Sequence, residues 1–196
     1  MKLLAFDLGS HKTGWALGQP GCPRPTISVW RVRRLGQTRE EAVADFSRRL
    51  RDLLDLETSV EKIAVEKYLD PMAQPETEQV ISSLLMHGAL RGVAAGYDIP
   101  VYEETVAKIR VHFIGRPTAV PARRRGAPPK SKRQVRIDRE ATKDLVWKQA
   151  VTLGYFERGE TPSWDKSDAV AVWDWAAATL CRAPRPFAFD PPRVSR

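Results

Sequence analysis

The chain has 196 residues, of which 42% are hydrophobic and 29% charged, a composition typical of one globular domain with extensions. No apolar run approaches the roughly 20 residues that a spanning helix needs, and the N-terminus lacks a signal-peptide pattern, so we expect no membrane association. The two cysteines, Cys22 and Cys181, have the spacing of neither a metal site nor a disulfide framework, which predicts a reducing, cytoplasmic location.

The net charge of +8 is concentrated in one segment. Residues 116–140 hold nine Lys and Arg, two acids and four Pro, a net charge of +7 that leaves only +1 for the other 171 residues. The prolines and the scarcity of apolar residues predict an extended, flexible insertion. Such a segment is either a solvated linker or a binding site for a polyanion such as DNA. In the second case its DNA-binding candidates are Arg123, Arg124, Arg125, Lys130, Lys132 and Arg133.

The apolar pattern predicts alternating strands and helices over residues 1–180. Strands are expected at 2–8, 14–18 and 26–33, followed by an amphipathic helix at 39–57 and a buried strand at 62–66. A long helix at 76–97, a fifth strand at 99–102 and helices at 105–113, 139–153 and 165–180 complete the pattern. Residues 181–196 form a proline-rich, irregular tail. This order predicts an α/β domain of the ribonuclease H-like fold, a five-stranded mixed sheet flanked by helices, over residues 1–180.

Four carboxylates stand at the ends of these predicted elements. Asp7 ends the first strand, Glu66 ends the fourth, and Asp165 and Asp168 lie three residues apart in the first turn of the last helix. If the first and fourth strands are neighbours, the first two acids lie side by side and the helix brings the other pair over them. Each acid alone also fits an ordinary role, as a turn residue or a partner of the helix dipole. Together they predict an anionic cluster.

Clustered carboxylates repel one another, and a divalent cation relieves that repulsion. Ligands that are all oxygen select hard ions, so the sequence predicts Mg²⁺, with Mn²⁺ as a substitute, bound by Asp7, Glu66, Asp165 and Asp168. Two such ions about 4 Å apart can activate a water molecule and stabilise the leaving oxygen in phosphodiester hydrolysis. The sequence therefore favours a nuclease with two ions per site.

These segments resemble the RuvC-type Holliday junction resolvases. LLAFDLGSHKTGWAL is similar to the opening strand and turn of that family, IAVEKYL to its second acidic strand, and DKSDAVAVWDWA to its closing Asp-x-x-Asp helix. LLMHGALRGVAAGYDIPVYEETVAKIR is similar to its long helix and the strand that follows. The resemblance covers about residues 1–180, and the long basic insertion is more like that of phage-encoded relatives than of the compact bacterial form.

The resemblance implies an endonuclease that resolves four-way junctions and other branched DNA by paired cuts. It implies that the four acids are catalytic, that Lys143 and Arg110 contact the scissile phosphate or the nearby backbone, and that Tyr68 engages unpaired bases. It also implies a homodimer formed through the helix at 76–97, acting in the cytoplasm of a bacterium or a phage-infected cell.

Two alternative functions stay open, a RuvX (YqgF)-like nuclease that processes RNA and a non-catalytic module that binds branched DNA. The Asp-Leu-Gly-Ser turn also resembles that of actin-like sugar kinases. Those enzymes need a second domain to close over the nucleotide, and 196 residues leave no room for one, so we expect no nucleotide cofactor.

Overall fold

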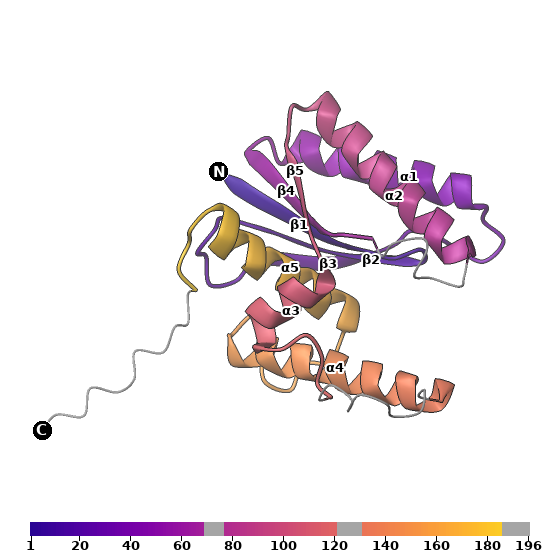
Figure 1. Cartoon of the computed structure of the whole chain (residues 1–196). Helices are drawn as coiled ribbons and strands as arrows, with labels where there is room; N and C mark the ends of the chain where they lie inside the picture. Colours follow the sequence, from indigo (N-terminus) through magenta and orange to yellow (C-terminus); the bar gives the residue numbers. More distant parts are fainter. Residues whose placement is uncertain (69–76, 121–130, 186–196) are drawn as a thin grey trace, which may run out of the picture.

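The computed structural model describes residues 1–68, 77–120 and 131–185. Strands and helices alternate much as predicted (Figure 1). The strands are β1 (Lys2–Leu8), β2 (Lys12–Gly18), β3 (Thr26–Arg31), β4 (Val60–Glu66) and β5 (Val101–Glu104). The helices are α1 (Arg39–Leu56), α2 (Thr77–Gly96), α3 (Val106–Ile114), α4 (Lys132–Thr152) and α5 (Trp164–Leu180).

The strands form one mixed sheet in the order β3-β2-β1-β4-β5. Strand β2 runs antiparallel to β1 and β3, whereas β1, β4 and β5 are parallel to one another. The chain passes through α1 between the parallel strands β1 and β4 and through α2 between β4 and β5, because parallel neighbours need a long crossover connection. The mixed sheet predicted from the sequence is confirmed.

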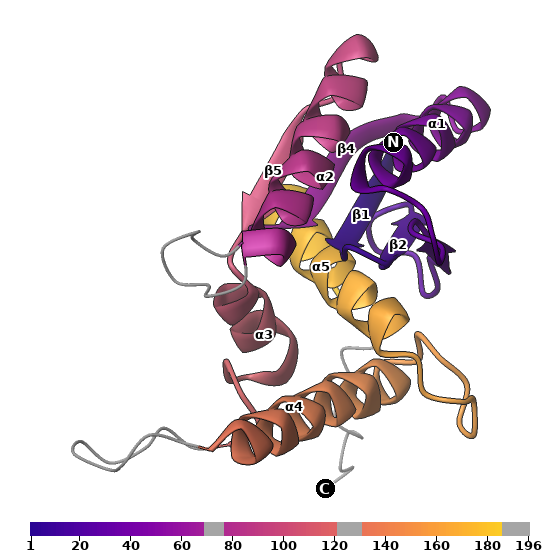
Figure 2. The ribbon, with the colours of Figure 1, turned by 90° about the vertical axis from the view of Figure 1, so that its right-hand side faces the viewer.

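Helices cover both faces of the sheet (Figures 1 and 2). Alternate residues of β1 supply the two cores, because successive side chains of a strand point to opposite faces. Leu4 and Phe6 pack with residues of α1 and α2, including Phe46 and Leu90. On the other face, Leu3 and Ala5 pack with residues of α3, α4 and α5.

Helix α5 lies directly against the sheet because the residues beneath it are small. Ala5, Ala16 and Ala64 come from three adjacent strands and are fully buried in the same core as α5. Along α5, Ser167 and all nine residues from 169 to 177 are buried, and Asp168 between them is half-buried. Figure 2 shows α5 crossing between the sheet and the outer pair α3 and α4.

Helix α4 is longer than the sequence predicted. The expected helix began at Arg139, whereas α4 begins at Lys132, so residues 132–140 of the expected extended insertion are helical. The Ser131 side chain caps the first turn by accepting a hydrogen bond from the Gln134 amide. Pairs four residues apart then support the exposed turns, Gln134 with Asp138 and Arg136 with Glu140. Local side-chain pairing thus outweighs the scarcity of apolar residues that predicted an extended chain here.

Several strand boundaries shift by two residues. Strand β2 begins at Lys12 and β4 at Val60, each two residues before its predicted start, and β3 ends at Arg31, two residues before its predicted end. Strand β5 begins at Val101 rather than at Ile99, because the Ile99 amide still bonds to the Ala94 carbonyl in the turn that ends α2.

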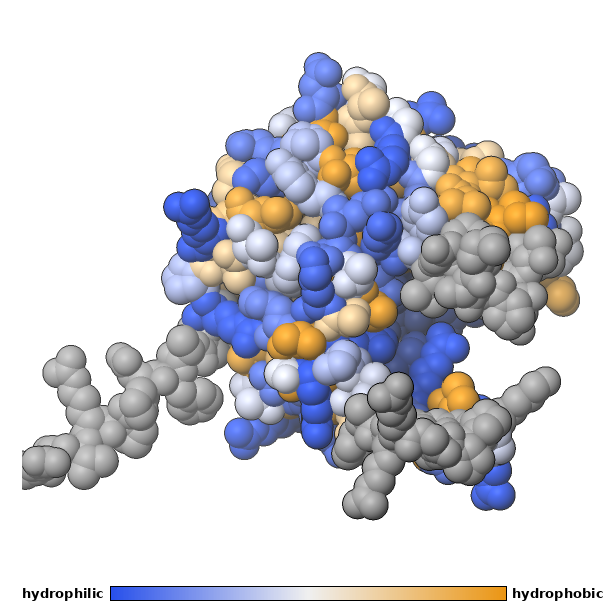
Figure 3. Space-filling view, viewed as in Figure 1, coloured by the Kyte–Doolittle hydropathy of each residue, from blue (hydrophilic) through white to orange (hydrophobic). Residues whose placement is uncertain are grey.

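The surface is mostly hydrophilic on the face drawn in Figure 3, with apolar residues in small, separate patches. Within the described part of the chain, no helix is both long and apolar enough to cross a membrane.

Candidate active site

The sheet register places Asp7 and Glu66 side by side. Strands β1 and β4 are parallel neighbours in which Phe6 pairs with Val65, so the next residue of each strand is one of the two acids. Both carboxylates lie at the carboxyl edge of the sheet, where ligands of α/β folds commonly bind. The juxtaposition predicted from the two strand ends is therefore confirmed.

Gly14 allows α5 to bring its first turn onto these strands. Gly14 of β2 pairs with Asp7 across the sheet, and a Cβ atom at this position would lie 2.0 Å from the Asp165 carbonyl oxygen and 3.2 Å from Ala169 Cβ. Only a residue without a side chain permits that approach. The helix start is thereby held over β1, with Asp165 and Asp168 toward Asp7.

Three cations from the outer helices face the acids. Lys143 of α4 reaches Asp168, with 3.7 Å between Nζ and Oδ2, and lies 5.2 Å from the centre of the Trp164 ring. Arg110 of α3 and Arg139 of α4 line the same pocket as the four carboxylates, a hollow of about 390 Å³. The structure thus brings together Lys143 and Arg110, which the family resemblance had singled out, with all four predicted acids.

Burial and mutual repulsion raise the proton affinity of these acids. Burial, followed by the charges of Asp168 and Glu66, holds the pKa of Asp7 well above its ordinary value. Burial and Asp168 raise the pKa of Glu66 to about 7, although Arg110, Lys143 and Arg139 oppose the rise. Burial also raises the pKa of Asp168, while Lys143 and Arg110 lower it. Burial is the largest cause of the raised pKa in all three acids, so these carboxylates are poorly solvated as well as close together.

This donor set fits a hard divalent cation. The lining acids Asp7, Glu66, Asp165 and Asp168 offer only carboxylate oxygens, and a bound cation would favour the ionised forms of Asp7 and Glu66, which burial disfavours. Among the described residues, no three acids, histidines or cysteines are gathered tightly enough to enclose a metal ion as they stand. Ion binding would accordingly draw these side chains inward.

The remaining predicted residues divide into two groups. Tyr68 lies at the pocket rim, with its ring centre 5.3 Å from that of His87. Arg133 is exposed on α4, and Lys132 is the first residue of that helix. Arg123, Arg124, Arg125 and Lys130 lie outside the described residues.

Sequence reasoning missed Gly14 beneath α5 and several residues that line the pocket, among them Arg139 and His87. Arg139 lies one helical turn before Lys143, and because the predicted helix at 139–153 contains both residues, their i, i+4 spacing could have identified it. His87 of α2 lines the pocket while its Nδ1 lies 3.3 Å from Glu103 Oε1. Nothing in the local sequence of α2 distinguishes this histidine from a core residue.

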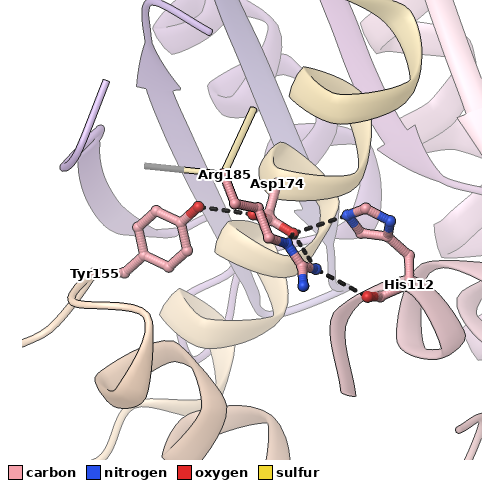
Figure 4. A network of polar contacts seen from close by, with 4 residues as sticks. All are labelled: His112, Tyr155, Asp174 and Arg185. Atoms are coloured by element: carbon pink, nitrogen blue, oxygen red, sulfur yellow. Dashed lines mark hydrogen bonds and ion pairs between the residues drawn. The ribbon is translucent and has the colours of Figure 1, made fainter. Parts of the chain in front are cut away.

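Outside the pocket, the buried carboxylate of Asp174 connects helix α3, which carries Arg110, with the segments that follow α4 and α5 (Figure 4). Asp174 of α5 is 2% exposed. Its carboxylate accepts hydrogen bonds from Tyr155 Oη at 2.7 Å and from Arg185 Nη2 at 2.6 Å. Its Oδ2 atom also lies 2.9 Å from His112 Nε2. Arg185 Nη2 also donates to the His112 carbonyl at 2.8 Å. This network joins α3, the segment after α4, and the segment after α5 to one side chain.

Comparison with known proteins supports the fold. No family model matches this sequence, and no curated protein matches it. Thermus thermophilus RuvC superposes with a TM-score of 0.63 over 95% of this chain and 99% of its own, at 18% identity. T. thermophilus RuvC in complex with a Holliday junction substrate also gives 0.63, over 92% and 96% of the two chains, at 17% identity.

A third solved structure extends the likeness to eukaryotes. The yeast mitochondrial Holliday junction resolvase Ydc2 superposes with a TM-score of 0.52 over 92% of this chain and 80% of its own, at 15% identity. The chain therefore has the ribonuclease H-like fold of RuvC, and the resemblance seen in its sequence is confirmed at the level of the fold.

Proposed function

We propose that this chain is a Mg²⁺-dependent endonuclease that cleaves branched DNA, including four-way junctions. The single observation that carries the proposal is the meeting of four carboxylates from β1, β4 and α5 with Lys143 of α4 in one pocket. The fold shared with RuvC, whose structure is known in complex with a Holliday junction substrate, supports the choice of substrate.

In this mechanism the four acids hold the cations and the basic residues hold the substrate. Bound Mg²⁺ ions would supply an activated water molecule and stabilise the leaving oxygen. Asp7 and Glu66 present their oxygens from the rigid sheet edge, while Asp165 and Asp168 do so from α5. Lys143 and Arg110 are placed to bind the phosphate oxygens, where their charge counts most as the transition state gains negative charge.

The basic residues around the pocket give the affinity for a polyanion. Arg133, Arg136 and Arg139 lie at three-residue intervals on α4 and lead toward Lys143 at the pocket. This spacing keeps them on neighbouring turns of the helix. We propose that they continue the phosphate-binding surface of the basic segment, which gives an attraction that is salt-sensitive and largely independent of sequence.

We further propose a homodimer formed through α2. Leu84 and Leu85 of this helix remain 38% and 40% exposed, while Leu90 and Ala94 of the same helix are buried. A two-fold dimer presenting two pockets would match the symmetry of a four-way junction. Light scattering of the wild-type protein and of a Leu84→Asp/Leu85→Asp variant tests this, and a monomeric wild type would reject it.

The test of the proposed activity is cleavage of an end-labelled synthetic four-way junction in Mg²⁺, beside a linear duplex of the same sequence. We expect paired nicks on opposite strands of the junction and none on the duplex. Asp7→Asn is the control for contaminating nucleases. Binding without nicking would favour the non-catalytic module, and cleavage of RNA instead of the junction would favour the RNA-processing alternative.

A further inference from the structure

The turn between β3 and α1, residues 32–38, lies beside the candidate active site. Strand β3 ends at Arg31 opposite Lys12 of β2, so the turn leaves the sheet at the edge that carries Asp7. The amides of Val32 and Arg33 both donate to the His11 carbonyl, at 3.0 and 3.3 Å. The residues on either side of His11, Ser10 and Lys12, line the catalytic pocket. The turn and the pocket are therefore neighbouring parts of one surface.

The backbone of this turn is fixed by its own hydrogen bonds. Arg33 Nε donates to the Gln37 carbonyl at 3.1 Å, and the Arg34 amide donates to Gln37 Oε1 at 2.9 Å. The Gln37 amide returns a bond to the Arg34 carbonyl at 3.2 Å, and Gly36 adopts a left-handed φ of 80°. Immediately afterwards Thr38 caps α1. The turn thus presents its remaining side chains from a rigid support.

Those side chains combine cations with one fully exposed apolar group. Leu35 has a relative exposure of 106%, the highest among the exposed large hydrophobic residues of the described chain. His11, Arg33 and Arg34 line a groove of about 630 Å³ beneath it. The Arg34 guanidinium is exposed and has no hydrogen-bond or ion-pair partner among the residues that the structure describes.

The nearby acids do not neutralise this groove. Glu41 lines the hollow on the other side of Leu35, where its carboxylate accepts the hydrogen bond from the Thr38 amide and, among the described residues, forms no ion pair with Arg34. Asp45 lines that hollow too, and it is paired with both Arg48 and Arg49. The groove therefore keeps its positive charge available for an external anion.

We infer that this turn is a second DNA-contacting surface, which binds an arm of the branched substrate beside the cleavage site. Arg34, with Lys12 and Arg33, binds backbone phosphates, and Leu35 packs against the sugar or an exposed base near the branch. Proteins commonly hold DNA with basic side chains and place an apolar residue against opened base steps. This inference rests on the proposed function, and it adds a surface on the β2–β3 side of the pocket, where the sequence analysis assigned no DNA contact.

Two matched single variants test the turn. Arg34→Ala is compared with Arg51→Ala, which removes the same charge from an exposed position near the end of α1. Leu35→Ser is compared with Leu56→Ser, which changes the 83% exposed leucine at the end of that helix. Dissociation constants for a fluorescent four-way junction are measured in Ca²⁺ over a range of salt concentrations. Thermal melting confirms that all four variants are folded.

The two variants of the turn are expected to act differently. Arg34→Ala should weaken junction binding about tenfold at 0.1 M salt, because one phosphate contact is lost. For the same reason, the slope of the logarithm of the binding constant against the logarithm of the salt concentration should fall in magnitude by about one. Leu35→Ser should weaken binding about three- to tenfold with the slope unchanged, because it loses only apolar contact. The variants Arg51→Ala and Leu56→Ser should match the wild type.

The outcomes separate this inference from the proposed function. If the wild type binds and cleaves the junction while each turn variant behaves like its control, the turn has no DNA contact and only the present inference falls. If Arg34→Ala and Arg51→Ala weaken binding equally, the effect is one of net charge and the inference also falls. If the wild type neither binds nor cleaves the junction, both proposals are wrong.

Discussion

Lys143 Nζ lies 3.7 Å from Asp168 Oδ2, and the two side chains are only 16% and 13% exposed. The pair joins the outer helix α4 to the acidic pocket, and the same ammonium lowers the pKa of Asp7 and of Glu66. The lysine is therefore one of the cations that offset the repulsion among the clustered carboxylates.

Replacing Lys143 by methionine should reduce cleavage about 100-fold, because a buried charge facing the reacting phosphate is lost. The midpoint of the pH–rate profile should also move upward, since the acids lose a cation that favours their ionised forms. Steady-state cleavage from pH 6 to pH 9 measures both effects. Lys148→Met, on an exposed position of the same helix, is the control, and an equal loss in both variants would contradict a specific role for Lys143.

The variant Asp7→Asn should abolish cleavage while making the metal-free protein more stable. Its carboxylate is held near Glu66 and Asp168, so a neutral amide of the same shape removes repulsion. We expect a gain of about 1 kcal/mol in the free energy of unfolding, as for other functional residues that are strained by their site. Chemical denaturation in EDTA measures it, with junction binding retained. Unchanged cleavage would remove Asp7 from the catalytic set.

Metal-free stability should fall as the pH rises from about 4.5 to about 7. The pKa of Glu66 is raised to about 7 in the folded protein, so the folded state binds more protons than the unfolded state across this window. The raised pKa values of Asp7 and Asp168 act in the same direction. The Glu66→Gln variant should flatten this slope.

Added Mg²⁺ should reverse the fall in stability with rising pH, because the ion competes with protons for the same oxygens. The increase in melting temperature caused by Mg²⁺ should be small at pH 6 and larger at pH 8. Melting curves with Mg²⁺ or EDTA at the two pH values test this directly. An equal increase at both would mean that the ion binds elsewhere.

Gly14→Ala should disrupt the site without touching any functional side chain. The added methyl group would lie 2.0 Å from the Asp165 carbonyl oxygen, so the start of α5 must move away from β2. We expect loss of Mg²⁺-dependent cleavage and a destabilisation of about 1–3 kcal/mol. Gly96→Ala is the control, because its Cβ would meet nothing within 4 Å. Normal cleavage by Gly14→Ala would show that α5 tolerates displacement.

Asp174→Ala should destabilise the fold by about 3–5 kcal/mol, because it leaves Arg185 without its buried partner. Burial alone would raise the pKa of Asp174, but hydrogen bonds from His112, Arg185 and Tyr155 hold it below its ordinary value. The network therefore stabilises the fold at neutral pH and is lost as acid protonates the carboxylate. Urea denaturation of the variant, beside exposed Asp52→Ala, measures the loss. Equal midpoints would contradict it.

The sequence predicted the acids of the site because strand ends and helix starts fix positions locally. Once β1 and β4 were taken as neighbours, Asp7 and Glu66 had to meet, and the register confirms it. The long-range approaches were not predictable in the same way. Gly14 is significant only because α5 packs on β2 there, and His112 and Asp174 are 62 residues apart in the chain.

Helix α5 contacts four strands of the sheet and both α3 and α4, yet among the described residues it is the last helix along the chain. During synthesis, the sheet face that it covers stays open to water until residue 180 has left the ribosome. Asp165 and Asp168 also reach Asp7 only at that point. A nascent chain is therefore unable to assemble the acidic pocket before its sheet is complete, so the same helix that closes the core also delays the meeting of the four carboxylates until folding is nearly finished.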